Sequence, residues 1–183
     1  DDYIECYPFR LASFYTPASE CGGDWWVHFN LSPGVDLVVV GDATGHGVPA
    51  ALITAMAYAT TNTFVKGMID SGDRKPSALL AEINSVLFNS LEGKMCMTFV
   101  AMIFDSKAGK IIYSNGGHVF PFLIPKSTED ERIKSGRIRK LKIPATSLVG
   151  GKGSSILGIA ADTEFNDNEV DLKVGDKFIQ IGR

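Results

Sequence analysis

Residues 41–52 read Gly-Asp-Ala-Thr-Gly-His-Gly-Val-Pro-Ala-Ala-Leu, and they follow residues 35–40, a β-branched run typical of a buried strand. Asp42 is therefore predicted to emerge at a strand end, where the two later glycines allow the backbone to turn sharply. The Val-Pro pair then begins a long apolar stretch, with proline near the first helical turn, where its missing N–H costs least. Such a strand–turn–helix corner gathers carboxylate and carbonyl oxygens, the ligands that hard cations such as Mg²⁺ prefer.

A second carboxylate, Asp24, lies in residues 22–26, Gly-Gly-Asp-Trp-Trp, directly before a predicted aromatic strand. Each aspartate also has an ordinary explanation. Asp42 could cap the following helix or close a turn, and Asp24 could cap a turn before the strand. From the residues alone, these alternatives stand beside an oxygen-rich cation site.

Several blocks in collinear order resemble a known family. Residues 17–25, Pro-Ala-Ser-Glu-Cys-Gly-Gly-Asp-Trp, match its Pro-Ala-x-x-x-Gly-Gly-Asp-aromatic pattern, and residues 41–51 match Gly-Asp-x-Ser/Thr-Gly-His/Lys-Gly-x-Pro-Ala-Ala. Further similar blocks are residues 97–101, 113–118, 155–159 and 172–176, where Gly116 replaces the usual alanine of an Asn-Ala-Gly-His turn. Together they resemble the bacterial regulatory branch of the PP2C-like (PPM) metal-dependent phosphatases, related to sporulation and stress-response serine phosphatases.

The resemblance implies a fold and a chemistry. The fold is α+β, an αββα sandwich of two antiparallel β-sheets flanked by helices, with residues 1–183 as a single domain. Asp42 would bridge two Mn²⁺ or Mg²⁺ ions, the Ala43 carbonyl would help bind one, and Asp24 would bind directly or through water. Two such cations activate a shared water, which would hydrolyse phosphoserine or phosphothreonine in bacterial signalling.

The three histidines are interpreted differently. His46 lies in the glycine turn beside Asp42, where it could hydrogen-bond phosphate or a metal-associated water, or give a proton to the leaving serine. Because related chains often have lysine there, a polar turn-stabilising role is the alternative. His118 and His28 are interpreted as structural.

One departure from the family pattern concerns the last residues. The family normally continues through Thr-Asp-Gly and Asp-Asp-x-Thr, whose acidic residues bind metal, whereas here residues 177–183 read Lys-Phe-Ile-Gln-Ile-Gly-Arg. We therefore expect an excised domain that is incomplete near its C-terminus. The alternative is a catalytically inactive pseudophosphatase that acts as a binding or signalling module.

Composition supports one globular domain. The chain has 183 residues, 45% of them hydrophobic, and a net charge of −3, which argues against nucleic-acid binding by phosphate neutralisation. A basic stretch, residues 132–142, is interpreted as one solvated strand face, with a docking surface for an acidic partner as the alternative. The three cysteines are predicted to be reduced. No stretch approaches the ~20 apolar residues needed to cross a bilayer.

The resemblance also suggests partners. The substrate would be a phosphoprotein, a STAS-type anti-anti-sigma factor in related systems. Members of the branch often sit behind sensor or membrane modules, so an upstream regulatory module, a cytoplasmic location with a membrane-attached parent, and a homodimer are expected.

Periodicity predicts the elements. The first helix covers residues 48–68, and the second begins at Pro76 with apolar residues at three-and-four spacing. The predicted strands are residues 9–15, 25–30, 35–40, 95–104, 110–114, 119–124, 137–143, 169–174 and 177–181. Trp25 and Trp26 point to opposite faces of their strand, so one is expected in the core and the other in the cleft.

Overall fold

The computed structural model describes residues 3–6, 9–15, 22–124, 126 and 155–182. Two helices follow one another in the chain between the fourth and fifth strands: α1 (Val48–Ser71) and α2 (Pro76–Leu91). The strands are β1 (Tyr3–Cys6), β2 (Phe9–Ala12), β3 (Asp24–Ser32), β4 (Val35–Ala43), β5 (Met97–Asp105), β6 (Lys110–Gly116), β7 (Phe122–Ile124), β8 (Asn168–Asp171) and β9 (Lys177–Ile179).

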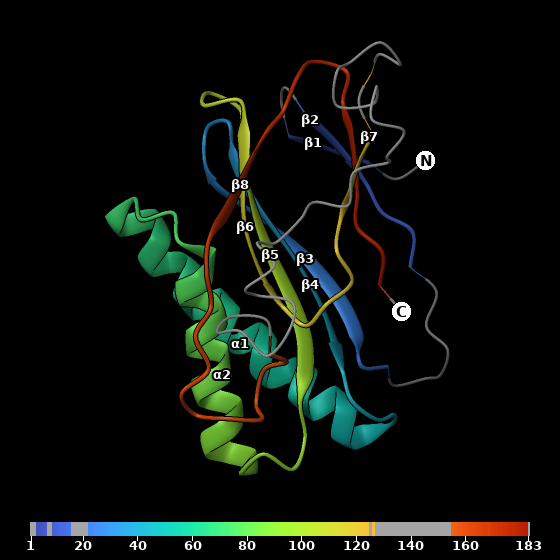
Figure 1. The fold of residues 1–183 in the computed structure, drawn as a ribbon, viewed down its shortest axis with the longest axis vertical. Helices are drawn as coiled ribbons and strands as arrows, with labels where there is room; N and C mark the ends of the chain where they lie inside the picture. Colours follow the sequence, from blue (N-terminus) through green and yellow to red (C-terminus); the bar gives the residue numbers. More distant parts are fainter. Residues whose placement is uncertain (1–2, 7–8, 16–21, 125, 127–154, 183) are drawn as a thin grey trace.

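A five-stranded antiparallel sheet, in the order β3-β4-β5-β6-β8, forms the centre of the fold. Two antiparallel ladders, β1-β2 and β7-β9, accompany it. Figure 1 shows α1 and α2 together on one side of the large sheet, with β1, β2 and β7 on the other side. The predicted α+β class is confirmed.

The helix-facing side of the sheet holds the larger core. Side chains alternate between the two faces of a strand, so Leu37 and Val39 of β4 and Phe99 and Ala101 of β5 face the helices, and all four are buried. The helices contribute residues from their inner faces, namely Ala50, Ile53, Ala57, Val65 and Met68 from α1 and Leu79, Leu80, Ile83 and Leu87 from α2. Apolar burial on this scale is the main driving force for folding.

The opposite side of the sheet carries a second, smaller core. Buried Val38, Val100, Met102, Ile111 and Tyr113 form it, and Leu11 of β2 and Phe178 of β9 pack against it. The Phe104 ring lies 5.6 Å, centroid to centroid, from the rings of both Phe9 and Phe178. The two small ladders are thereby held on the face of the sheet that the helices leave open.

The structure confirms both predicted helices and the β5–β6 hairpin. Most strands differ from prediction only at their ends, whereas β1 was not predicted at all. Trp25 packs against the helix-side core, in contact with the rings of Tyr58 and Phe99. The predicted strand at 137–143 and the basic stretch at 132–142 lie outside the described residues.

Candidate metal site where β3 begins and β4 ends

Asp24 and Asp42 lie opposite each other on neighbouring strands. Asp24 begins β3 and Asp42 is the penultimate residue of β4, and the two are Cα partners in the antiparallel ladder. Directly opposed residues point to the same face, with Cβ atoms about 4.5–5.5 Å apart. That face is the one shared with Val38, away from the helices. The structure thus brings together the two aspartates that the sequence singled out.

The backbone around this pair is closely packed. The Ala43 N–H donates to the Gly23 carbonyl over 3.1 Å, and the Thr54 hydroxyl of α1 donates to the same carbonyl over 3.1 Å. A Cβ atom at Gly23 would overlap the carbonyl oxygen of Ala43. Glycine is therefore required before Asp24, and the Ala43 carbonyl oxygen lies at the same corner as the two carboxylates.

The electrostatics of the pair fit a cation. Burial, and secondly the negative charge of Asp42, raise the pKa of Asp24. The Asp24 Oδ1 atom is buried and accepts no hydrogen bond from the described part of the chain. A buried carboxylate oxygen normally has a donor or a metal as partner. The donor set, two carboxylates and a carbonyl, suits Mg²⁺ or Mn²⁺.

His46 is exposed in the loop that joins β4 to α1. The start of this loop is fixed to the residue before β5, because the Thr44 N–H and hydroxyl both donate to the Cys96 carbonyl, over 2.9 and 3.0 Å. His46 thus lies on the turn that follows Asp42.

Other residues at this corner were not predicted as part of the site. Thr98 is the Cα partner of Asp42 on β5, and its hydroxyl lies 2.7 Å from Nδ1 of His118. The Tyr15 hydroxyl donates to the Asp24 carbonyl over 3.1 Å. Gly182 also lies close, since a Cβ atom there would be 3.5 Å from Asp24 Oδ1. Thr98 and His118 lie in sequence blocks already singled out, residues 97–101 and 113–118, whereas Tyr15 and Gly182 left no such signal.

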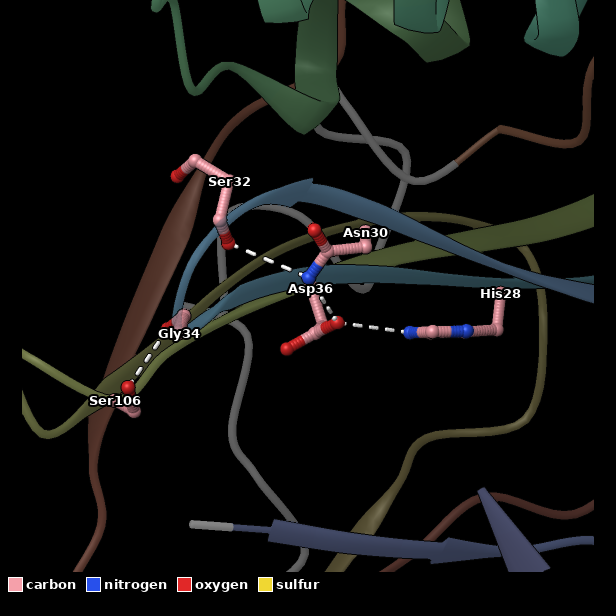
Figure 2. A network of polar contacts seen from close by, with 6 residues as sticks. All are labelled: His28, Asn30, Ser32, Gly34, Asp36 and Ser106. Carbon is pink, nitrogen blue, oxygen red and sulfur yellow. Dashed lines mark hydrogen bonds and ion pairs between the residues drawn. The ribbon is translucent and has the colours of Figure 1, made fainter. Parts of the chain in front are cut away.

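A separate polar network occupies the other end of the same two strands (Figure 2). The Asp36 carboxylate is buried, and its Oδ1 atom lies 2.9 Å from Nε2 of His28 and 3.0 Å from Nδ2 of Asn30. The Ser106 hydroxyl donates to the Gly34 carbonyl over 2.8 Å at the adjoining turn. The partner of His28 in this network, Asp36, lies six residues before Asp42 on β4. At the rise of a strand, the two aspartates are about 20 Å apart.

Within the described residues, no group of three or more His, Cys, Asp or Glu side chains is arranged to hold a metal ion. The candidate site therefore consists of two carboxylates and backbone oxygens. None of the helices described is both long enough and apolar enough to span a membrane.

The comparisons with solved structures show the fold. The SiaA-PP2C domain of Pseudomonas aeruginosa is 22% identical, with a TM-score of 0.68 over 90% of this chain and 57% of that chain. The RsbU and RsbW domains of Rv1364c from Mycobacterium tuberculosis are 21% identical, with a TM-score of 0.63 over 89% of this chain and 39% of that chain. RsbX in complex with magnesium is 14% identical, with a TM-score of 0.62 over 88% of this chain and 66% of that chain. The chain thus spans less than two thirds of each of these structures.

No curated protein matches the chain. A family model, described as Stage II sporulation protein E (SpoIIE), matches residues 33–181, which include Asp42, the following glycine turn, both helices and strands β4 to β9. The match covers more than half of the chain and agrees with the PP2C-like fold of the solved structures. The chain therefore belongs to the SpoIIE family of PP2C-type phosphatase domains.

Proposed function

We propose that this domain is a metal-dependent protein serine/threonine phosphatase that hydrolyses phosphoserine or phosphothreonine. The observation that carries the proposal is the opposition of Asp24 and Asp42, with a buried Asp24 oxygen that no described donor satisfies. Two close carboxylates repel each other, and divalent cations bound between or beside them would offset this electrostatic repulsion. The RsbX structure with magnesium supports the choice of cation class.

In this proposal each residue has a defined task. Asp42 would bridge two Mn²⁺ or Mg²⁺ ions, the Ala43 carbonyl would complete the coordination of one, and Asp24 would bind directly or through water. When bound, a pair of divalent cations supplies charge neutralisation and lowers the pKa of a water molecule. His46, exposed on the adjoining loop, would donate a proton to the leaving serine or threonine oxygen.

The test is turnover of an aryl phosphate and a phosphoserine peptide with Mn²⁺, with Mg²⁺ and with excess chelator. We expect hydrolysis only with added metal. Asp42→Asn should lower kcat at least about a hundredfold, because the metals supply most of the catalysis, while circular dichroism shows intact folding. Asp70→Asn, on the exposed end of α1, is the matched control. Equal turnover in excess chelator would refute the proposal.

His46→Ala belongs to the same experiment but separates two roles. Loss of a proton donor should lower kcat by about a hundredfold or more and leave Mn²⁺ affinity unchanged. His46→Lys, the residue that related chains often carry, should recover activity. If His46→Ala keeps full kcat, the histidine only shapes the turn.

A second candidate is a pseudophosphatase that binds a phosphoprotein without turnover. The described residues provide only two carboxylates at this corner, which is the observation in its favour. Reading the parent sequence beyond position 180 discriminates the two, because Thr-Asp-Gly and Asp-Asp motifs favour the enzyme.

Two relatives of the same fold suggest what kind of partner the domain has. One solved relative combines RsbU and RsbW domains, and another has a stressosome context, which suggests a regulatory pathway. We propose a STAS-type phosphoprotein as substrate and an attached sensor or a second copy of the chain as regulator. Pull-down of phosphorylated and unphosphorylated STAS domains by Asp42→Asn protein tests the first point, and equal capture of both forms would contradict it.

A further inference from the structure

We propose that His118 is a positioning residue that holds Thr98 in one rotamer beside Asp42, and so fixes the carboxylate that would bridge the metals. This inference rests on the proposed function, and it concerns residues outside the ligand set described above. It starts from two sequence blocks, residues 97–101 and 113–118, to which the proposed chemistry assigns no role.

The fold brings those two blocks into contact. Gly117 forms a parallel bridge with Phe99, so the chain leaving β6 returns to the beginning of β5. His118 is buried there, and its Nδ1 atom lies 2.7 Å from the Thr98 hydroxyl. This distance is at the short end of hydrogen bonds between nitrogen and oxygen. The contact joins residues twenty positions apart at the end of the sheet that carries Asp42.

His118 is itself held in place by its own turn. The side chain of Asn115 accepts a hydrogen bond from the His118 N–H at 2.8 Å and donates one to the His118 carbonyl at 3.1 Å. Gly117 has a φ of 72°, and a Cβ atom at this position would overlap the Ile156 side chain. The Asn-Gly-Gly-His sequence therefore serves to deliver one imidazole to one hydroxyl.

The packing around Gly116 explains why this turn has glycine where the Asn-Ala-Gly-His pattern has alanine. A Cβ atom at Gly116 would overlap Cδ1 of Leu157, which is fully buried and pairs with Met97 at the start of β5. In this chain the space that an alanine methyl would need is taken by Leu157. The substitution thus preserves the close approach of the turn to β5.

The consequence for Asp42 follows from strand geometry. Thr98 and Asp42 are directly opposed on β5 and β4, so their side chains are neighbours on one face. A threonine has few staggered χ1 states, and a short bond to His118 selects one of them. The surface that Thr98 presents to Asp42 is then constant, which limits the rotamers of the carboxylate. A ligand fixed before the metal arrives binds it more tightly than one that must be ordered.

Calorimetric titration of Mn²⁺ tests this without any turnover measurement. Thr98→Val keeps the shape of the side chain but removes the hydroxyl, and His118→Gln removes the imidazole. Each variant should bind Mn²⁺ about two- to tenfold more weakly, the size of effect expected for the loss of one hydrogen bond. The double variant should be no weaker than the single ones, because both act through one contact. Thr98→Ser should retain wild-type affinity.

The matched control is Thr61→Val. Its hydroxyl is also buried and donates to the Ala57 carbonyl over 2.8 Å, but it lies in the middle of α1. It should lower the melting temperature and leave Mn²⁺ affinity unchanged. If folded Thr98→Val binds Mn²⁺ as tightly as wild type, the positioning role is overturned, whatever happens to His118→Gln. If wild type binds no Mn²⁺, the proposed function fails and this inference fails with it.

Discussion

Among single residues, Asp24 carries an electrostatic cost in the folded domain. Its pKa is raised by burial first and by the charge of Asp42 second. A carboxylate whose native pKa is raised destabilises the fold above that pKa, and the penalty disappears as the pH falls below its ordinary value of 3.8. Such costs are typical of functional sites, where ligand binding offsets them.

Asp24→Asn should therefore stabilise the metal-free domain at neutral pH. Solvent screening at this partly buried position keeps the gain in free energy of unfolding small. In a domain of this size, each 1 kcal/mol raises the melting temperature by about 2–4 °C. The same variant should lose the rise in melting temperature that Mn²⁺ gives to wild type. Differential scanning calorimetry with and without Mn²⁺ measures both effects. A variant that is less stable without metal and still stabilised by Mn²⁺ would contradict the assignment.

A pair of glycine variants tests the packing of the metal corner. Gly23→Ala places a methyl group against the Ala43 carbonyl, which is backbone and has little freedom to move. We expect a loss of several kcal/mol, the range seen for overpacking and strain. Gly67→Ala is the control, because its Cβ would enter open space on α1. It should stabilise the domain by roughly 0.5–1 kcal/mol, as chemical denaturation would show. Equal stability of the two variants would argue against the close contact.

Among the elements, β3 and β4 divide into two polar ends with an apolar middle. One end holds Asp24 and Asp42, and the other holds the buried Asp36 carboxylate with His28 and Asn30 (Figure 2). Removing a buried carboxylate leaves the groups that donate hydrogen bonds to it without an acceptor. The two ends are far enough apart for their effects to be independent.

Asp36→Ala should therefore lower stability by about 2–4 kcal/mol without changing Mn²⁺ affinity. The loss follows from leaving the His28 and Asn30 donors without their acceptor. Urea denaturation measures the first effect and calorimetric Mn²⁺ titration of the folded variant measures the second. A large fall in Mn²⁺ affinity would show that the two ends are coupled.

The elements also show what local sequence patterns can predict. Both helices were predicted from long apolar segments and from prolines at their starts, since these are local signals. The strand predicted at 35–40 continues through Asp42 to Ala43 because β3 and β5 pair with it on both sides, which is tertiary information. β1 was missed because its four residues, Tyr3–Cys6, are too short a run to show the alternation of a strand. The Thr98–His118 contact could not be predicted, since it depends on how the chain returns after β6.

At the scale of the whole molecule, the metal corner connects the sheet to α1. The Gly23 carbonyl accepts hydrogen bonds from Ala43 of β4 and from Thr54 of α1. The helix begins at Val48, only a short loop after Ala43, and its N-cap, Gly47, provides no side-chain hydrogen bond to the first turn. The first turns of α1 are thus positioned by their contacts with the corner, because capping contributes little there.

Mn²⁺ binding should therefore order the beginning of α1. We expect amide hydrogen exchange to slow at residues 50–55 when Mn²⁺ is added, with little change in α2, which lies against β5 and β6. Thr54→Val should weaken this response, and Thr63→Val, exposed further along the helix, should not. Val48 and Leu52 are 65% and 61% exposed at this end of α1. A partner that docks there and binds the metal-loaded domain more tightly would raise the affinity of the domain for Mn²⁺. Mn²⁺ would raise the affinity of the domain for that partner by the same factor. Unchanged exchange at residues 50–55 on addition of saturating Mn²⁺ would rule out this route of control.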